Sequence, residues 1–245
     1  MYKVVIDDIK TEASPGATIL SVAKQELIEI PTLCYNENLD PRGACRICTV
    51  EVEVWGRKRL VTACNYPINA DIIVNTKSER VIKLRQLILE VLWARTPNSK
   101  RIIELAEKYN VKKPRFTIEQ TTDNCIVCGL CVQVCKDIVG VNAIGLSNRG
   151  IFRKPITPYQ EPSQTCIGCG SCVYVCPTDA ITMIDKDGKR YFERWKTEFK
   201  LVGCESCGSY FATDAQIEYI RKVIGKDDPS LHYCPSCLVL QETKK

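Results

Sequence analysis

The chain has 245 residues, with 34 Lys and Arg against 29 Asp and Glu, 16 cysteines and one histidine. This length suggests one large domain or two to three small ones, and so many cysteines indicate either disulfides or metal sites. A single histidine excludes a histidine-rich metal site. The formal charge of +5 would become negative if all the cysteines were thiolates around four metal centres, so the basic excess does not require a nucleic-acid partner.

No targeting signal or membrane segment is expected. The sequence shows no apolar signal core, no twin-arginine pair and no apolar stretch near the length of about 18 residues that spans a bilayer. We therefore expect a soluble, cytoplasmic protein without a membrane span, although a membrane-bound partner is compatible with the sequence. In that reducing compartment cysteines bind metal rather than pair as disulfides.

Residues 1–77 are expected to form a small domain rich in strands. Alternating apolar residues predict strands at 3–9, 49–54, 58–62 and 72–76, and a short helix is predicted at 18–26. Four cysteines follow the spacing C-x10-C-x2-C-x15-C, namely Cys34, Cys45, Cys48 and Cys64. A [2Fe–2S] cluster needs four thiolates, typically with one distant in the sequence, so we predict such a cluster here. The preceding Gly43-Ala44 pair suits a backbone that wraps closely around it.

Residues 78–113 are expected to form a helical linker. Apolar residues at i, i+3 and i+4 spacing predict an amphipathic helix that Pro97 ends, and a second helix is predicted at 102–109. The predicted apolar face consists of Val81, Leu84, Leu87, Ile88, Val91 and Leu92. We expect this face to pack within the domain rather than to dock a partner.

Residues 114–190 contain the run C-x2-C-x2-C-x3-C twice. The two runs are Cys125, Cys128, Cys131, Cys135 and Cys166, Cys169, Cys172, Cys176. In such runs three thiolates bind one [4Fe–4S] cluster and the fourth cysteine binds the other. The predicted first site is therefore Cys125, Cys128, Cys131 and Cys176, and the predicted second site is Cys166, Cys169, Cys172 and Cys135. Two clusters tied in this way can exchange electrons.

The residue after each run differs. Pro177 follows Cys176, as the ferredoxin pattern expects, but Lys136 follows Cys135. Lys136 either raises the reduction potential of a nearby cluster or simply faces the solvent.

Residues 191–245 form a tail with two C-x2-C pairs, Cys204, Cys207, Cys234 and Cys237. Four thiolates in paired knuckles suit a tetrahedral zinc or single iron ion, and a third [4Fe–4S] cluster is the less favoured alternative. A helix is predicted between the pairs, with a capping box beginning at Thr213 and Gly225 as its C-terminal cap. His232 either supports the metal ligands or is an ordinary surface residue.

The cysteine motifs resemble a known family. The spacing from Cys34 to Cys64 and its flanks resemble the N-terminus of the large iron–sulfur subunit of respiratory complex I, of iron-only hydrogenases and of the small diaphorase subunit of NAD-reducing hydrogenases. The resemblance covers about residues 1–190. It implies an α+β protein with an N-terminal β-grasp [2Fe–2S] ferredoxin domain, a helical linker and a bacterial-type 2[4Fe–4S] ferredoxin domain, followed here by the small four-cysteine module.

Two features depart from that family. Its linker often carries one histidine and three cysteines that bind a further [4Fe–4S] cluster, but residues 93–100 of this chain contain neither residue type. The tail resembles rubredoxin knuckles, zinc ribbons and the four-cysteine tails of ferredoxin-like subunits in some membrane hydrogenase complexes.

No dinucleotide-binding G-x-G-x-x-G and no Walker A loop is present, and the four predicted sites use every cysteine, so we expect catalysis to reside in another subunit. The resemblance implies an iron–sulfur subunit that relays electrons between a flavin- and NAD(P)-binding subunit and a hydrogenase, formate dehydrogenase or similar catalytic subunit, with ferredoxin as a further candidate partner. An electron-bifurcating complex fits the same parts. The alternatives are a free-standing polyferredoxin carrier and a redox-sensing or assembly protein.

Overall fold

The computed structural model describes residues 1–116, 123–226 and 228–242. The chain divides into two compact units, Met1–Leu130 with Pro177–Ala180 and Cys131–Cys176 with Ile181–Lys245. Helices and antiparallel strands occur in both units, which confirms the predicted α+β class. Each unit is described by itself below.

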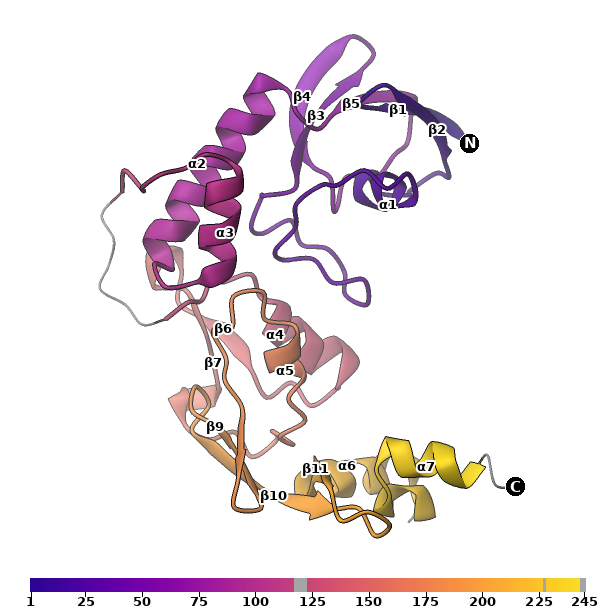
Figure 1. Cartoon of the computed structure of the whole chain (residues 1–245), viewed down its shortest axis with the longest axis vertical. Helices are drawn as coiled ribbons and strands as arrows, with labels where there is room; N and C mark the ends of the chain where they lie inside the picture. The colour runs from indigo at the N-terminus through magenta and orange to yellow at the C-terminus, as the bar shows by residue number, and fades with distance from the viewer. Residues whose placement is uncertain (117–122, 227, 243–245) are drawn as a thin grey trace. The chain divides into compact units, whose positions relative to one another are not determined.

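The first unit begins with a five-stranded sheet in the order β2-β1-β5-β3-β4 (Figure 1). Its strands are β1 (Tyr2–Ile6), β2 (Ile9–Ala13), β3 (Thr49–Val54), β4 (Arg57–Thr62) and β5 (Ile72–Asn75). β1 and β5 are parallel and the other neighbours are antiparallel. Helix α1 (Ile19–Gln25) shares one buried core with the sheet. This is the predicted β-grasp arrangement.

The N-terminal strand is shorter than predicted. Asp7 and Asp8 adopt positive φ angles of 45° and 73°, so the chain turns there and returns as β2, which pairs with β1 from Tyr2 opposite Ala13 to Ile6 opposite Ile9. Aspartate tolerates this left-handed backbone better than most residues. The predicted single strand at 3–9 is therefore a hairpin.

Two helices follow the sheet, as predicted. The Ser78 hydroxyl caps α2 (Glu79–Arg95), and α3 (Lys100–Lys108) follows after Pro97. The buried face of α2 carries Val81, Arg85, Leu89 and Leu92. The expectation of packing within the domain is confirmed, but the face is rotated from the predicted one, because the predicted Leu87 and Val91 are 40% and 49% exposed.

The rotation brings Arg85 into the interior of the first unit. Its side chain donates to the backbone carbonyl of Thr49 at 2.8 Å and to the hydroxyl of Tyr109 at 2.9 Å. The residue is 2% exposed. Arg85 thus joins α2 to β3 and to the end of α3.

Replacing Arg85 by Met is expected to lower the free energy of unfolding of the first unit by about 1–3 kcal/mol, because the buried Thr49 carbonyl loses its side-chain donor. The control is Arg80→Met on the same helix. Arg80 is exposed and pairs with Glu51, and an exposed ion pair contributes less than about 1 kcal/mol. Hydrogen exchange of the α2 amides measures both values, and equal losses would contradict a structural role for Arg85.

The second unit contains a four-stranded antiparallel sheet in the order β11-β10-β9-β8. Its strands are β8 (Ile184–Lys186), β9 (Lys189–Phe192), β10 (Thr197–Gly203) and β11 (Tyr210–Thr213), and a separate pair is formed by β6 (Gly145–Ser147) and β7 (Lys154–Ile156). The domain boundary predicted between residues 190 and 191 falls inside β9. One sheet therefore joins the segment after the second cysteine run to the beginning of the tail.

The helical elements of the second unit are short except for α6. They are α4 (Leu130–Gln133, with its first residue in the first unit), the π-helical turn Val134–Ile138, α5 (Ser171–Tyr174), α6 (Asp214–Ile224), α7 (Pro235–Glu242) and the 3-10 turns Gly150–Phe152, Pro158–Gln160 and Pro229–His232.

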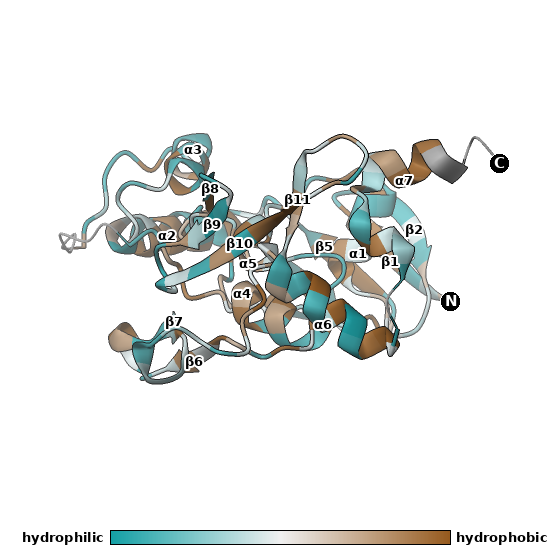
Figure 2. Cartoon of the chain, turned by 90° about the horizontal axis from the view of Figure 1, so that it is seen from below, coloured by the Kyte–Doolittle hydropathy of each residue, from teal (hydrophilic) through white to brown (hydrophobic). Residues whose placement is uncertain are grey.

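The predicted caps of α6 are confirmed. The Thr213 hydroxyl accepts from the Gln216 N–H, and Gly225 is left-handed with φ 69°. Figure 2 shows hydrophobic and hydrophilic bands alternating along α6, as a one-sided helix requires.

A buried core holds the second unit together. It contains Phe192 and Trp195 together with Ala143, Ile144 and Ile181. The rings of Phe192 and Phe199 meet edge to face with centroids 6.3 Å apart. Among the described residues, no helix combines the length and the apolar character that crossing a bilayer demands.

Candidate iron–sulfur and metal centres

The four cysteines predicted to bind a [2Fe–2S] cluster all lie in the first unit and are all buried. Cys34 follows α1, Cys45 and Cys48 precede β3, and Cys64 follows β4. The backbone N–H of Cys45 donates to the Cys34 sulfur at 3.3 Å. The loop before Cys45 turns at Gly43, whose φ is 61° and whose added Cβ would lie 2.8 Å from Asn65 Nδ2. Gly43 thus sits in a tight turn that leaves no room for a side chain, and its wrapping around a cluster stays a prediction.

The thiols of this group influence one another. A side-chain contact with Cys45 lowers the pKa of Cys34, and the same contact, with burial, raises the pKa of Cys45. Cys48 and Cys64 form a second such pair, in which the pKa of Cys64 is raised by contact with Cys48, then by burial, and further by charge on the other two thiols. Four buried thiols that contact one another in two pairs suit a shared metal cluster, which binds thiolates.

The helical pair covers this group from one side. Leu89 and Leu92 of α2 and Ile102 and Leu105 of α3 belong to the same buried cluster as Cys34 and Cys45. The linker therefore shields the cysteine loop from water, which strengthens electrostatic interactions around it.

The four cysteines predicted to bind the first [4Fe–4S] cluster are divided between the two units. Cys125 and Cys128 belong to the first, whereas Cys131 and Cys176 belong to the second. Within the first unit, Arg95 donates to the Cys125 carbonyl at 3.0 Å, and the Val127 N–H donates to the Cys125 sulfur at 3.4 Å. This ligand set stays a prediction.

The predicted second site lies wholly within the second unit. Its four cysteines, Cys135, Cys166, Cys169 and Cys172, line one pocket, together with the apolar side chains of Val139, Val141, Ile144, Ile167, Phe192 and Trp195. The structure thus brings the last cysteine of the first run next to the first three of the second run. Burial raises the pKa of the Cys166 thiol and raises that of Cys172 to about 12, which favours the protonated form of these two thiols when no positive ion is bound.

Two N–H groups point at sulfurs of this second site. The Ala143 backbone N–H donates to Cys135 Sγ at 3.2 Å, and the Trp195 indole Nε1 donates to Cys172 Sγ at 3.4 Å. Cys135 itself lies in the π-helical turn, where Lys136 takes the place of a proline and is exposed. Of the two alternatives for Lys136, the structure favours the solvent-facing one.

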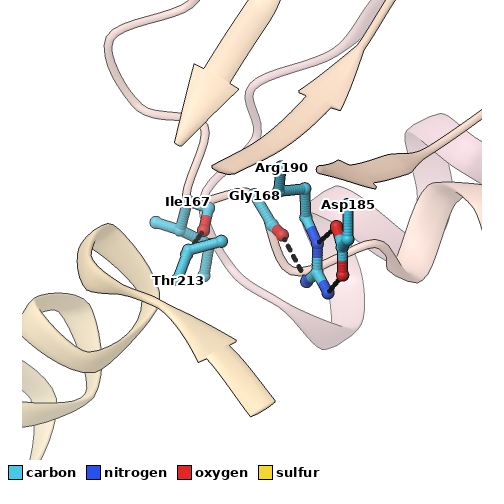
Figure 3. Close-up of polar contacts among 5 residues, drawn as sticks. All are labelled: Ile167, Gly168, Asp185, Arg190 and Thr213. Atoms are coloured by element: carbon cyan, nitrogen blue, oxygen red, sulfur yellow. Dashed lines mark hydrogen bonds and ion pairs between the residues drawn. The ribbon is translucent and has the colours of Figure 1, made fainter. Parts of the chain in front are cut away.

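Side chains of two other segments hydrogen-bond to Ile167 and Gly168, in the loop between Cys166 and Cys169, as Figure 3 shows. Arg190 donates to the Gly168 carbonyl at 3.2 Å, and the Thr213 hydroxyl donates to the Ile167 carbonyl at 2.5 Å. Gly168 has a φ of 65°, and a Cβ added there would lie 2.6 Å from a ring carbon of Phe199. The loop therefore has room for glycine only.

Replacing Gly168 by Ala is expected to destroy or destabilise the second site, because it combines a strained left-handed backbone with a clash against a packed ring. The control is Gly150→Ala, since Gly150 shares a positive φ of 60° but would meet nothing within 4 Å. In the control variant, the left-handed backbone alone is expected to lower the free energy of unfolding by about 1–2 kcal/mol. EPR of the reduced protein, counting [4Fe–4S] signals per chain, separates the two, and equal losses in both variants would contradict the packing argument.

The four tail cysteines form a compact group. Their sulfur atoms all lie within 4.8 Å of one another, and those of Cys207 and Cys234 are 3.8 Å apart. The backbone N–H of Cys234 contributes most to lowering the pKa of Cys204, to about 6. These residues therefore form a four-cysteine metal site at the C-terminus.

His232 supports this group without belonging to it. Its Nδ1 lies 3.0 Å from a carboxylate oxygen of Glu205, and its carbonyl accepts the Glu205 N–H at 3.0 Å. Glu205 sits between Cys204 and Cys207, so the contacts tie the first knuckle to the segment before Cys234.

Comparison with protein families covers most of the chain. Residues 1–79 match the model of a 2Fe-2S iron-sulfur cluster binding domain, and residues 117–183 match that of a 4Fe-4S dicluster domain. A second dicluster model matches residues 165–211 and so includes Cys204 and Cys207. The chain carries a 2Fe–2S domain followed by a 4Fe–4S dicluster domain.

Curated relatives contain the same domains. The chain is 33% identical over 173 residues to NADPH-Fe(3+) oxidoreductase subunit alpha of Geobacter sulfurreducens, covering 61% of this chain and 20% of that protein. It is 32% identical over 179 residues to NADP-reducing hydrogenase subunit HndD of Solidesulfovibrio fructosivorans, covering 61% and 30%. It is 30% identical over 173 residues to the NADH-ubiquinone oxidoreductase 75 kDa subunit of Reclinomonas americana, covering 61% and 25%. The chain spans 20–30% of the length of these relatives.

Solved structures include a chain with a similar fold. A chain from the crystal structure of NAD+-reducing [NiFe]-hydrogenase in the H2-reduced state aligns with a TM-score of 0.62 and 22% identity, covering 78% of this chain and 87% of that one. The iron–sulfur domains of the chain are thus homologous to parts of complex I and hydrogenase subunits, as the cysteine motifs predicted, and also to part of an NADPH-Fe(3+) oxidoreductase subunit.

Proposed function

We propose that this chain is the iron–sulfur electron-transfer subunit of a multisubunit oxidoreductase. It would relay electrons between a flavin- and NAD(P)-binding subunit and a hydrogenase, formate dehydrogenase or similar catalytic subunit in the cytoplasm. The relatives with the same domains are named as subunits of NADH-ubiquinone oxidoreductase and NADP-reducing hydrogenase. Their names support a fixed place in a complex rather than independent action.

The observation that carries the proposal is the pocket that contains Cys135, Cys166, Cys169 and Cys172. This set mixes the two cysteine runs, as two interlocked [4Fe–4S] clusters require. When bound, iron–sulfur clusters accept and release single electrons, and the protein sets their spacing and surroundings. In this chain the cysteines would hold them, while Phe192, Trp195 and Ile144 exclude water from the second site.

The remaining cysteine groups fit the same proposal. Cys34, Cys45, Cys48 and Cys64 would hold a [2Fe–2S] cluster, and Cys125, Cys128, Cys131 and Cys176 the first [4Fe–4S] cluster. Residues 93–100 offer neither histidine nor cysteine for the further cluster that the family often has. Apart from the tail ion, the chain would accordingly provide three redox centres.

For the tail we propose a single zinc or iron ion. An ion about 2.3 Å from four tetrahedral sulfurs places them about 3.8 Å apart, which agrees with the 3.8 Å between Cys207 and Cys234. A third [4Fe–4S] cluster fits less well, because each thiolate would bind a different iron and the sulfurs would lie farther apart. The dicluster match that includes Cys204 and Cys207 makes the iron content of the tail worth measuring separately.

The test is gentle anaerobic purification of the full chain from its native host through an affinity tag. The proposal predicts co-purification of a flavoprotein and a catalytic oxidoreductase subunit, and reduction of the chain's clusters by NADH or NADPH in that complex. A chain recovered only as a monomer, with clusters that neither nucleotide reduces, would instead indicate the free-standing polyferredoxin.

A further inference from the structure

We propose that Trp195 tunes the reduction potential of the cluster in the second site. Arg190 and Thr213 are positioning residues that hold the loop of that site. The inference rests on the proposed function, because it requires a [4Fe–4S] cluster bound by Cys135, Cys166, Cys169 and Cys172. All these residues belong to the second unit, and none of the three lies within a cysteine run.

Trp195 lies in the turn between β9 and β10 and is 3% exposed. Its ring lines the same pocket as the four cysteines, and its Nε1 is 3.4 Å from Cys172 Sγ. An indole nitrogen can only donate a hydrogen bond. The sulfur of Cys172 is therefore the acceptor, and the contact favours the more negative state of the ligand.

The surroundings make this single contact effective. Apart from the cysteines, the pocket wall near Trp195 is formed by residues such as Val139, Ile144 and Phe192. In a site of low polarity a hydrogen bond is weakly screened. Reduction adds negative charge that spreads over the ligand sulfurs, so the Trp195 N–H stabilises the reduced cluster more than the oxidised one. Hydrogen bonds to the sulfurs are one of the factors that set cluster potentials, and this one raises the potential.

Arg190 fixes one carbonyl of the loop. Its Nε and Nη2 each lie 2.8 Å from a different oxygen of Asp185, and its Nη1 donates to the Gly168 carbonyl (Figure 3). The two-pronged pair orients the guanidinium plane. Because the Arg190 side chain is only 11% exposed, the third contact is held in a defined direction, next to Cys169.

Thr213 fixes the neighbouring carbonyl. Its hydroxyl donates to Ile167 and accepts from the Gln216 N–H at the beginning of α6. The residue is fully buried. A second hydrogen bond joins α6 to the same pocket: the Tyr219 hydroxyl on α6 donates to the Val139 carbonyl at 3.0 Å. The end of β11 and helix α6, which lie between the two tail cysteine pairs, therefore also contact the second site.

The test of Trp195 is the variant Trp195→Phe, which keeps an aromatic ring and removes the N–H. It is made in the full chain and in a Cys128→Ala background, where the second site is the only intact [4Fe–4S] site. Anaerobic redox titration followed by EPR is expected to give a lower midpoint potential for that cluster, with an unchanged [2Fe–2S] midpoint and unchanged iron content. Trp55→Phe, at an 88% exposed position in the first unit, is expected to shift neither.

The test of the positioning residues is the rate at which the second cluster is lost to an iron chelator. Thr213→Val and Arg190→Gln are each expected to speed this loss by about fivefold to tenfold, the equivalent of one lost hydrogen bond. Thr213→Ser keeps the hydroxyl and is expected to restore most of the wild-type rate. Because the Thr213 hydroxyl also caps α6, hydrogen exchange of the α6 amides is measured in the same variants: Arg190→Gln should speed cluster loss without speeding that exchange, whereas a merely destabilised fold would speed both.

The outcomes separate the inference from the proposed function. Wild-type protein without any [4Fe–4S] signal would contradict the proposed function. Two [4Fe–4S] signals with an unshifted midpoint in Trp195→Phe would contradict the tuning role alone. Equal loss rates in wild type, Thr213→Val and Arg190→Gln would contradict the positioning roles.

Discussion

Replacing Cys135 and Cys169 together by Ala is expected to remove one [4Fe–4S] cluster, whereas replacing Cys135 and Cys128 together is expected to remove both. The reason is the shared pocket of Cys135, Cys166, Cys169 and Cys172. If Cys135 and Cys169 bind the same cluster, either substitution removes that cluster and the second one removes no other. Cys128 belongs to the other predicted set, so its loss adds to that of Cys135.

The experiment uses EPR of the reduced, anaerobically prepared full chain. The Cys135→Ala/Cys169→Ala protein should keep one [4Fe–4S] signal without the broadening that a neighbouring paramagnetic cluster causes, and the Cys135→Ala/Cys128→Ala protein should keep only the [2Fe–2S] signal. If each run bound its own cluster, the two double variants would exchange results. The [2Fe–2S] signal is the internal control in both, because Cys34, Cys45, Cys48 and Cys64 are untouched.

Replacing Cys204 by Ala is expected to have the second large effect. It leaves three thiolates where a closed site needs four, and loss of a structural metal is among the few changes that cost more than about 4 kcal/mol. We expect the tail metal to be released and the amides of α6 to exchange quickly. Because Thr213 and Tyr219 link this region to Ile167 and Val139, the second [4Fe–4S] cluster should also become more labile.

The matched control is Val223→Ala on α6, where the side chain is 65% exposed. An exposed substitution of this kind changes stability by less than about 0.5 kcal/mol. Metal analysis and hydrogen exchange of both variants provide the comparison. Release of the tail metal without any change in the second cluster would show that the tail and that site are independent.

The cysteine groups could be predicted from the sequence because each motif is defined by the spacing of cysteines that are close together in the chain. The pattern around Cys166 to Cys176 specifies a cluster motif without reference to tertiary structure, and the caps of α6 at Thr213 and Gly225 are equally local. The helices of the linker were predicted for the same reason, since their apolar residues recur at helical spacing.

What the sequence did not reveal depends on contacts between distant segments. Arg85 looks like a surface residue in a helical pattern, but it is buried because Thr49 and Tyr109 accept its hydrogen bonds. Trp195 belongs to none of the predicted motifs, and its contact with Cys172 exists because the turn between β9 and β10 lies beside the pocket. The only sequence feature that could have pointed to this contact is the presence of a tryptophan after the second cysteine run.

The N-terminal hairpin shows a related limit. Apolar residues lie on both sides of Asp7 and Asp8, at Ile6 and Ile9, so the sequence pattern predicts one strand at 3–9. The pair of left-handed aspartates ends β1 and starts β2. An Asp-Asp pair is a weaker turn signal than Asn-Gly or Asp-Gly, which explains why the turn is not evident from the pattern.

The most direct test of the central claim is the metal content of the anaerobically purified full chain, combined with EPR spin quantification. One [2Fe–2S] and two [4Fe–4S] clusters give about 10 Fe per chain, with one zinc, or with one further iron, in the tail. The reduced protein should show one [2Fe–2S] spin and two mutually broadened [4Fe–4S] spins. About 6 Fe per chain after careful anaerobic reconstitution, with a single unbroadened [4Fe–4S] signal, would contradict the pair of interlocked clusters.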